Sequence, residues 1–323
     1  MQSLSQSLSQ FLPRCLMSLL LGLGLLSPLK APAAETLKPD TLWLRQELRR
    51  MGLSRAFTEE SLRHYEPEGF KTVLTLNLLG FLQPPGQHMN HVTPQAVKEA
   101  AKFIRENKKA FAEAQEKFAV PADVISSLLW IETRHGDDVG RFHTLSVFLH
   151  LLQADLKKNR RELISLALKK NQKERRYSSK ELRTLMAERT KKKSQWAREQ
   201  LVALASLRKK KHLDVTTLRG SFAGAFGLPQ FIPSSYRDFA TAFKETATPD
   251  LNTSADAIFS VANYLAENGW ESQDKDSQVA ALMKYNNSRD YADSILEISK
   301  QVPAQVLPLP PQREVSSAEK DAP

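Results

Sequence analysis

The stretch "SLLWIETRHG", residues 127–136, places the ionisable Glu132 inside a run that otherwise has the pattern of a buried helix. Pro121 begins the predicted helix and Gly136 ends it in the manner of a C-cap. Apolar residues recur at helical spacing ahead of Glu132, so we expect its carboxyl group in the last turn, on or beside the apolar face. Burial raises the pKa of a carboxyl group, as a general acid at neutral pH requires. A surface glutamate whose stem packs on Leu128 is the alternative.

A second stretch, "GSFAGAFGLPQF" at residues 220–231, consists mainly of small residues and turn formers. Three glycines and two alanines leave the backbone open to close approach by another part of the chain or by a ligand. Ser221 and Gln230 are the polar side chains in this stretch, and each can donate and accept hydrogen bonds. The pattern is compatible with a ligand-lining loop and equally with tight packing between helices.

A third stretch, "KYNNS" at residues 284–288, interrupts a helical pattern near the end of the chain. Tyr285 and Asn286 at such a break can line a polar cleft that binds ring-shaped ligands. Asparagine also caps helices often, so a purely structural role is the competing interpretation.

Several classes of chemistry have no support in the sequence. The seven histidines show no HExxH pattern, and no EF-hand or Walker loop is present. The single cysteine, Cys15, lies in the N-terminal segment, so no cysteine nucleophile remains after that segment is removed. We therefore expect no metal site and no cofactor.

Residues 1–34 have the features of a secretory signal peptide. "CLMSLLLGLGLLSPL", residues 15–29, follows Arg14 and leads to small residues around Ala34. The apolar run is short for a membrane-spanning helix, so we favour cleavage over an uncleaved anchor. A lipidated cysteine would follow the apolar run, whereas Cys15 stands at its start, which argues against a lipid anchor. We expect an exported, periplasmic protein.

The mature chain divides into three segments by composition. Residues 35–115 form a predicted N-terminal helical region. Residues 93–118 have the pattern of one long helix, which extends beyond residue 115. Residues 116–302 form a predicted core, and residues 303–323 a Pro-rich tail expected to be disordered.

Within the core, residues 157–211 carry the positive charge of the protein. They contain 20 Lys and Arg against 5 Glu, a net +15, whereas the whole chain is +10. "SSKE" at 178–181 predicts a capped helix. We expect one apolar stripe of this helix, its docking stripe, to pack against the rest of the protein. In an exported chain, an anionic envelope polymer or a membrane surface is the expected partner, not nucleic acid. A solvated helical hairpin is the alternative.

Four motifs together resemble one enzyme family. "IETRHG", "GSFAGAFGLPQFIPSSY", "DAIFSVANYL" with "ENGW", and "KYNNSRDY" follow in the order of the lytic murein transglycosylase B family. The resemblance covers about residues 95–298. It implies a mostly α-helical, goose-lysozyme-like core that cleaves the β-1,4 bond between N-acetylmuramic acid and N-acetylglucosamine in peptidoglycan. Such cleavage leaves a 1,6-anhydromuramyl end.

The resemblance also implies roles for individual residues. Glu132 matches the family's catalytic acid/base, and the motif positions for substrate binding fall on Ser221, Gln230, Tyr285, Asn286 and Tyr291. Some members carry a calcium loop where this chain reads "KETATPDLNTSADAI", which has too few carboxylates, so we expect no calcium. A lysozyme-type hydrolase and a non-catalytic glycan-binding protein of the same fold remain alternatives.

Overall fold

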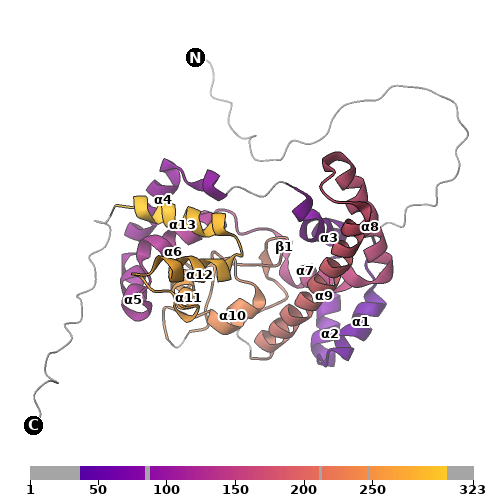
Figure 1. Cartoon of the computed structure of the whole chain (residues 1–323). Coiled ribbons are helices and arrows are strands. Elements are labelled where there is room, and N and C mark those ends of the chain that lie inside the picture. Colours follow the sequence, from indigo (N-terminus) through magenta and orange to yellow (C-terminus); the bar gives the residue numbers. More distant parts are fainter. Residues whose placement is uncertain (1–36, 84–87, 211–212, 246, 304–323) are drawn as a thin grey trace, which may run out of the picture. The chain divides into compact units, whose positions relative to one another are not determined.

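The structure is a computed structural model, and it describes residues 37–83, 88–210, 213–245 and 247–303. The predicted signal peptide and the predicted disordered tail from residue 304 onward lie outside the described residues. The described chain is mostly helical, with one short two-stranded ribbon, which confirms the predicted fold class (Figure 1).

The helices and strands follow one another along the chain as α1 (Thr41–Arg50), α2 (Arg55–Arg63), α3 (Phe70–Leu79), α4 (Pro94–Glu106), α5 (Lys108–Phe118), α6 (Ala122–Thr133), β1 (Phe142–His143), α7 (Thr144–Leu152), α8 (Lys157–Glu174), α9 (Ser179–Lys209), β2 (Arg219–Gly220), α10 (Pro233–Phe239), α11 (Ser254–Glu267), α12 (Lys275–Tyr285) and α13 (Arg289–Gln301). Short 3-10 turns lie between several helices, among them η3 (His88–His91).

Helix α6 is the centre of one group of helices. It packs against α4, α5, α11 and α13 (Figure 1). Ile125, Leu128 and Leu129 are fully buried, as the apolar pattern of the sequence predicts. Burying a side chain of this size stabilises the fold by about 1.5–3 kcal/mol. Several such side chains on one helix therefore fix the direction in which its last turn points.

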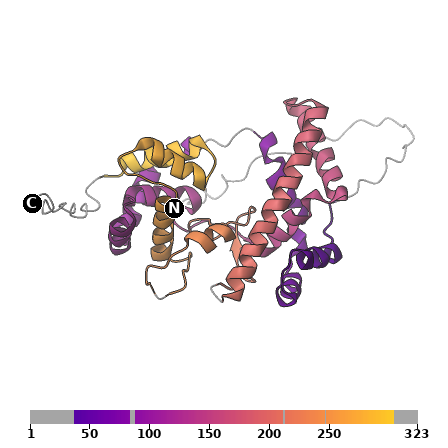
Figure 2. The same cartoon turned by 60° about the horizontal axis from the view of Figure 1, so that its bottom comes forward.

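The two helices of the basic segment are integral to the fold. Helix α9 packs against α7, α8 and α10, and it is the longest helix in Figure 2. The predicted capping box is confirmed, because Ser178 accepts from the Glu181 N–H and Glu181 bonds back to Ser178. The predicted docking stripe is confirmed too, and its buried members include Leu182, Met186, Thr190, Ser194, Ala197, Leu201 and Leu204.

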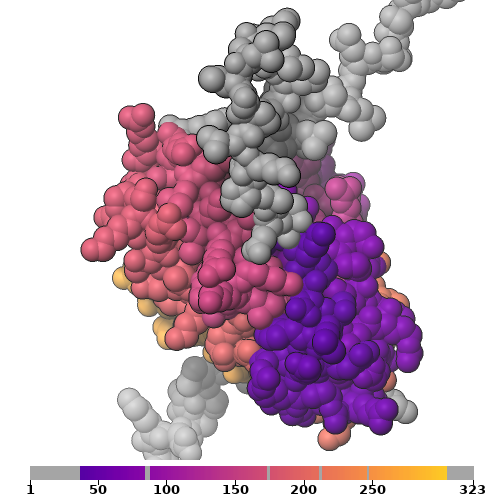
Figure 3. Space-filling model, turned by 90° about the vertical axis from the view of Figure 1, so that its right-hand side faces the viewer, coloured from indigo at the N-terminus to yellow at the C-terminus, as the bar shows by residue number. Residues whose placement is uncertain are grey.

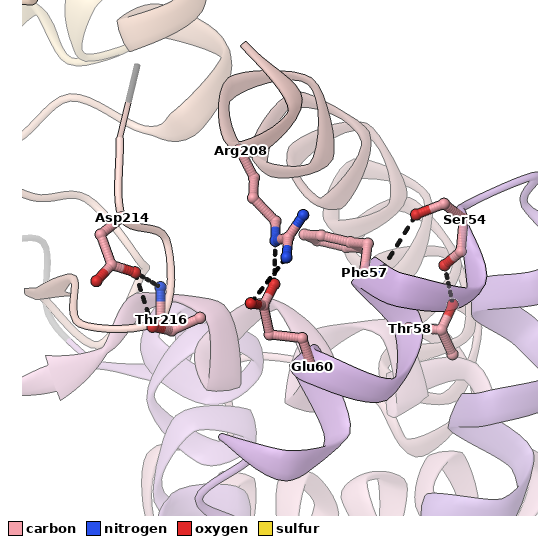
Figure 4. A network of polar contacts seen from close by, with 7 residues as sticks. All are labelled: Ser54, Phe57, Thr58, Glu60, Arg208, Asp214 and Thr216. Carbon is pink, nitrogen blue, oxygen red and sulfur yellow. Dashed lines mark hydrogen bonds and ion pairs between the residues drawn. The ribbon is translucent and has the colours of Figure 1, made fainter. Parts of the chain in front are cut away.

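The N-terminal helices are held against α9 by charged contacts. Glu47 on α1 is buried and pairs with Arg198 of α9. At the end of α9, Arg208 donates two hydrogen bonds to the carboxylate of Glu60 on α2 (Figure 4). Figure 3 shows the surfaces of the N-terminal and the basic helices side by side. A buried carboxylate such as Glu47 requires a cationic partner, so these pairs fix which faces meet.

The expectation of one long helix over residues 93–118 was wrong. The chain leaves helical geometry at Asn107, with φ −117° and ψ 30°, so that α4 ends and α5 begins there. The Asn107 side-chain amide donates to the Phe103 carbonyl at 2.9 Å. Asparagine competes for backbone hydrogen bonds in this way, which the apolar periodicity of the sequence does not reveal.

The described residues belong to one compact unit, so the predicted boundary near residue 115 stays a prediction. Across the helices of the described chain, none has both the length and the apolar character needed to cross a bilayer.

Candidate active site

Glu132 lies in the last turn of α6, as its sequence position predicts. The helix begins after Pro121 and ends at Arg134, which adopts a left-handed C-cap with φ 52°. Because Leu128 and Leu129 anchor the preceding turn in the core, the Glu132 side chain is directed toward α13 and is half-buried. An ionisable group is therefore held beside the core while part of it stays accessible.

Tyr291 is the direct partner of this carboxyl group. Its hydroxyl donates to Glu132 Oε1 at 2.5 Å, and the tyrosine itself is fully buried. The first turn of α13 positions Tyr291, because the Ser288 cap accepts from the Tyr291 N–H. Two elements far apart in sequence thus meet at one carboxyl group.

The pKa of Glu132 is raised from its usual 4.5 to about 7, because burial penalises the charged form. The hydrogen bond from Tyr291 favours the carboxylate and offsets part of this rise. Near neutral pH the group is consequently poised to give up or to accept a proton.

Tyr285, at the end of α12, lies next to Tyr291. Its ring lies 6.5 Å from that of Tyr291 at an interplanar angle of 16°, and its hydroxyl donates to the Pro229 carbonyl. Burial raises the pKa of both tyrosine hydroxyls well above their usual value, so both are neutral donors. The structure therefore brings Glu132, Tyr285 and Tyr291 together, as the sequence predicts for one site.

Residues 220–231 form a folded loop whose glycines touch other parts of the protein. A side chain at Gly220 would come within 1.9 Å of the Ala225 carbonyl oxygen, and one at Gly224, where φ is 82°, within 2.5 Å of the Phe148 ring. Of the two interpretations of this stretch, tight packing is thus directly visible.

Gln230 holds this loop near the end of α6. Its side-chain amide donates to the Val139 carbonyl at 3.0 Å, and its own φ is 51°. Nearby, Thr133 Oγ1 donates to the Leu228 carbonyl at 2.8 Å, while the Pro229 carbonyl accepts from Tyr285. The successive carbonyls of Leu228 and Pro229 therefore accept hydrogen bonds from α6 and from α12.

Ser221 and Asn286 have no contact with Glu132 among the hydrogen bonds of the described residues. Ser221 is half-buried next to the β1–β2 ribbon, and its hydroxyl accepts from the Ala225 N–H at 3.3 Å. Asn286 is exposed and caps α12 through its backbone N–H, which donates to the Leu282 carbonyl. Both positions remain predicted substrate contacts.

His88 is a neighbour of the site that the sequence did not suggest. Its ring lies edge-on to Tyr291 at 5.5 Å, and its backbone N–H donates to the Asp290 carboxylate. Turn η3 packs on α13 through these contacts. No motif marks this segment, because the two partners are about 200 residues apart and only the tertiary fold joins them.

The predicted absence of a metal stays a prediction. Within the described ranges, no group of three or more His, Cys, Asp or Glu is arranged to hold a metal ion. Asp256, in the first turn of α11, accepts backbone N–H groups of the preceding loop on both carboxylate oxygens, from Phe243 and from Asp250.

These features define a helical, lysozyme-like domain whose site is built around one carboxyl group with a raised pKa. A family model described as the Transglycosylase SLT domain matches residues 38–280, and the chain belongs to this family. The resemblance found in the sequence is thereby confirmed.

Known relatives agree with this assignment. Over 191 residues the chain is 28% identical to membrane-bound lytic murein transglycosylase B of Escherichia coli, covering 59% of this chain and 42% of that protein. The chain thus spans less than half of that relative. Among solved structures, the lytic transglycosylase Slt35 of Escherichia coli matches with a TM-score of 0.60 at 20% identity, over 82% of this chain and 93% of that one. SltB3 of Pseudomonas aeruginosa matches with a TM-score of 0.58 at 15% identity, over 81% and 78%.

Proposed function

We propose that the protein is a lytic transglycosylase that cleaves the β-1,4 bond between N-acetylmuramic acid and N-acetylglucosamine in peptidoglycan. The observation that carries this proposal is Glu132, a single half-buried carboxyl group with a pKa raised to about 7. The family assignment supports the substrate class, and the relative SltB3 has been solved with a NAG-NAM-pentapeptide. The products carry 1,6-anhydromuramyl ends.

In the proposed reaction, one carboxyl group makes both proton transfers. Protonated Glu132 donates its proton to the glycosidic oxygen as the bond from that oxygen to C1 of the muramyl residue breaks. The N-acetyl group of the same sugar stabilises the electron-poor C1. The Glu132 carboxylate then accepts the proton of the 6-hydroxyl while O6 bonds to C1, which closes the anhydro ring and restores the acid.

A pKa near the working pH suits this double role, because both protonation states of Glu132 are well populated there. The Tyr291 hydroxyl orients the carboxyl group through its hydrogen bond. We assign Ser221, Gln230, Tyr285 and Asn286 to holding the saccharide rings. Ordinary glycosidases use a second carboxylate as base or nucleophile, and here the substrate supplies both the stabilising group and the nucleophile.

Mass spectrometry of the fragments released from purified sacculi tests this proposal. The parent protein should release anhydromuramyl products, and Glu132→Gln should release none. Asp123→Asn is the matched control, because Asp123 lies on the same helix and burial raises its pKa too, but it sits in the first turn. Reducing muramyl ends would establish the lysozyme-type hydrolase instead. Binding without any product would establish the non-catalytic glycan-binding protein.

We further propose that the protein acts in the periplasm and that residues 157–211 bind an anionic envelope polymer or a membrane surface. Exposed cations on α8 and α9, such as Lys157, Arg161, Arg183 and Lys191, support the second point. Replacing these four by glutamine should weaken binding to sacculi or to anionic vesicles and flatten its salt dependence. An unchanged salt dependence would argue against this role.

A further inference from the structure

A groove of about 650 Å³ lies on the other side of α6 from Glu132. It runs between α4 and the end of α6, and its lining includes Trp130 and His135. Residues 130 and 132 are two positions apart on a helix, so their side chains point about 160° away from one another. A ligand in this groove would therefore lie on the face of α6 turned away from Glu132.

The floor of the groove is a strip of aromatic rings. The His135 ring stacks on Phe103, with centroids 4.0 Å apart and planes at 6°, and Trp130 follows at 5.5 Å from His135. Burial lowers the pKa of His135 to about 4, so this ring is neutral at physiological pH. Trp130 is half-buried, and its indole N–H has no hydrogen-bond partner among the described residues. The floor thus offers the partly exposed rings of Trp130 and His135 and a free donor, with Phe103 buried beneath His135.

The rim of the groove is polar and carries charges of both signs. Gln95 and Glu99 line it from α4, and Asn107 lines it from the break between α4 and α5. The Gln95 amide donates to Glu99 at 2.6 Å, which leaves one N–H and the carbonyl of that amide for a ligand. Amides and carboxylates together accept from and donate to hydroxyl groups.

The backbone that forms the floor is held in an unusual conformation. Arg134 and His135 are successive non-glycine residues with φ of 52° and 59°. One left-handed residue suffices to end a helix, and a second non-glycine residue in this conformation is strained. The second is fixed by the stacking of His135 on Phe103 and by its hydrogen bond to the Ser126 carbonyl at 2.9 Å. A strained segment thus maintains the aromatic strip.

We infer that this groove is a second glycan-binding site, which takes an N-acetylated amino-sugar unit of the strand that is cut at Glu132. Sugar rings present apolar C–H faces that pack on aromatic rings, with hydroxyl and amide groups around their edge, and the groove matches both features. Its volume falls within the range of small-ligand sites. Holding a long strand at a second point raises the effective concentration of its glycosidic bonds at Glu132.

The inference rests on the proposed function for its choice of polymer, and its test does not require cleavage. The groove variant is Gln95→Ala with Glu99→Ala. The control variant is Lys98→Ala with Arg105→Ala, two exposed residues of the same helix that do not line the groove. All binding is measured with Glu132→Gln present, using sacculi as the long ligand and a single disaccharide-peptide as the short one.

We expect the groove variant to bind sacculi about tenfold more weakly, as the loss of one or two hydrogen bonds predicts, with unchanged binding of the short ligand. The control variant should match the parent in both. Equal losses on both ligands, or none on sacculi, would overturn the inference.

A titration with the tetramer of N-acetylglucosamine supplies an independent readout. The indole N–H signal of Trp130, assigned by Trp130→Phe, should shift in the NMR spectrum as the tetramer binds. A shift caused only by free stem peptide would also overturn the inference, because the groove would then be a peptide site.

Discussion

The Tyr291→Phe substitution tests the coupling between Tyr291 and Glu132. It removes the hydroxyl that donates to Glu132 Oε1 and keeps the buried ring. That bond favours the carboxylate form, so its loss should raise the pKa of Glu132 above about 7. A hydrogen bond to a charged group is worth about 1.5–3 kcal/mol, and one pKa unit corresponds to about 1.4 kcal/mol. Because the hydroxyl also bonds to the neutral acid, we expect a net shift of about one unit.

The assay is the pH dependence of kcat/KM on soluble glycan strands, followed by the release of anhydromuramyl products between pH 5 and pH 9. Cleavage requires protonated Glu132, so the basic limb of this profile reports its pKa in the free enzyme. In the parent we expect the limb near pH 7, and in Tyr291→Phe near pH 8. The variant should therefore keep a larger share of its own maximal activity at pH 8.5 than the parent does.

Tyr285→Phe is the matched control for this experiment. It also removes one tyrosine hydroxyl, from the ring next to Tyr291, but that hydroxyl bonds to the Pro229 carbonyl and not to Glu132. Its basic limb should stay at the position of the parent. If the limb of Tyr291→Phe did not move, or moved to lower pH, the argument that Tyr291 sets the pKa of Glu132 would be refuted.

Three further predictions concern stability, measured by urea unfolding. Gly224→Ala should cost at least about 1–2 kcal/mol, because φ is 82° and the new methyl group meets the Phe148 ring, whereas Gly80→Ala, with φ −58° and open space around it, should be close to neutral. His150 is buried with a pKa lowered to about 3, so the unfolded chain binds a proton below pH 6.5 that the folded chain excludes. The contribution of His150 to the free energy of unfolding therefore falls by up to about 1.4 kcal/mol per pH unit on acidification. His150→Gln should make the free energy of unfolding depend less on pH between pH 7 and pH 5. The pH dependence of stability that arises from Glu132 has the opposite sign, because folding raises its pKa. Its contribution to the free energy of unfolding is therefore lost as the pH rises from 4.5 to 7. Glu132→Gln should accordingly be more stable relative to the parent at pH 8 than at pH 5, and a constant difference would contradict the raised pKa.

The sequence by itself determined where most helices form and which residue is the half-buried acid, Glu132. The apolar spacing around Leu128 and Leu129 is periodic, and burial follows directly from it, so both α6 and the raised pKa of Glu132 were predictable. The capping box at Ser178 was predictable for the same kind of reason, since capping depends on residues within one turn. The break at Asn107 was missed, because apolar periodicity continues through it.

Only the tertiary structure decided which groups meet. Tyr291 bonds to Glu132 across 159 positions of sequence, and His88 packs on Tyr291 from a segment without any motif. The glycines of residues 220–231 turned out to approach protein atoms, which composition alone left open. Local patterns fix the conformation of a segment through interactions within a few residues. The partners of a side chain depend on how whole helices pack, and that is settled by the combined burial of many distant residues.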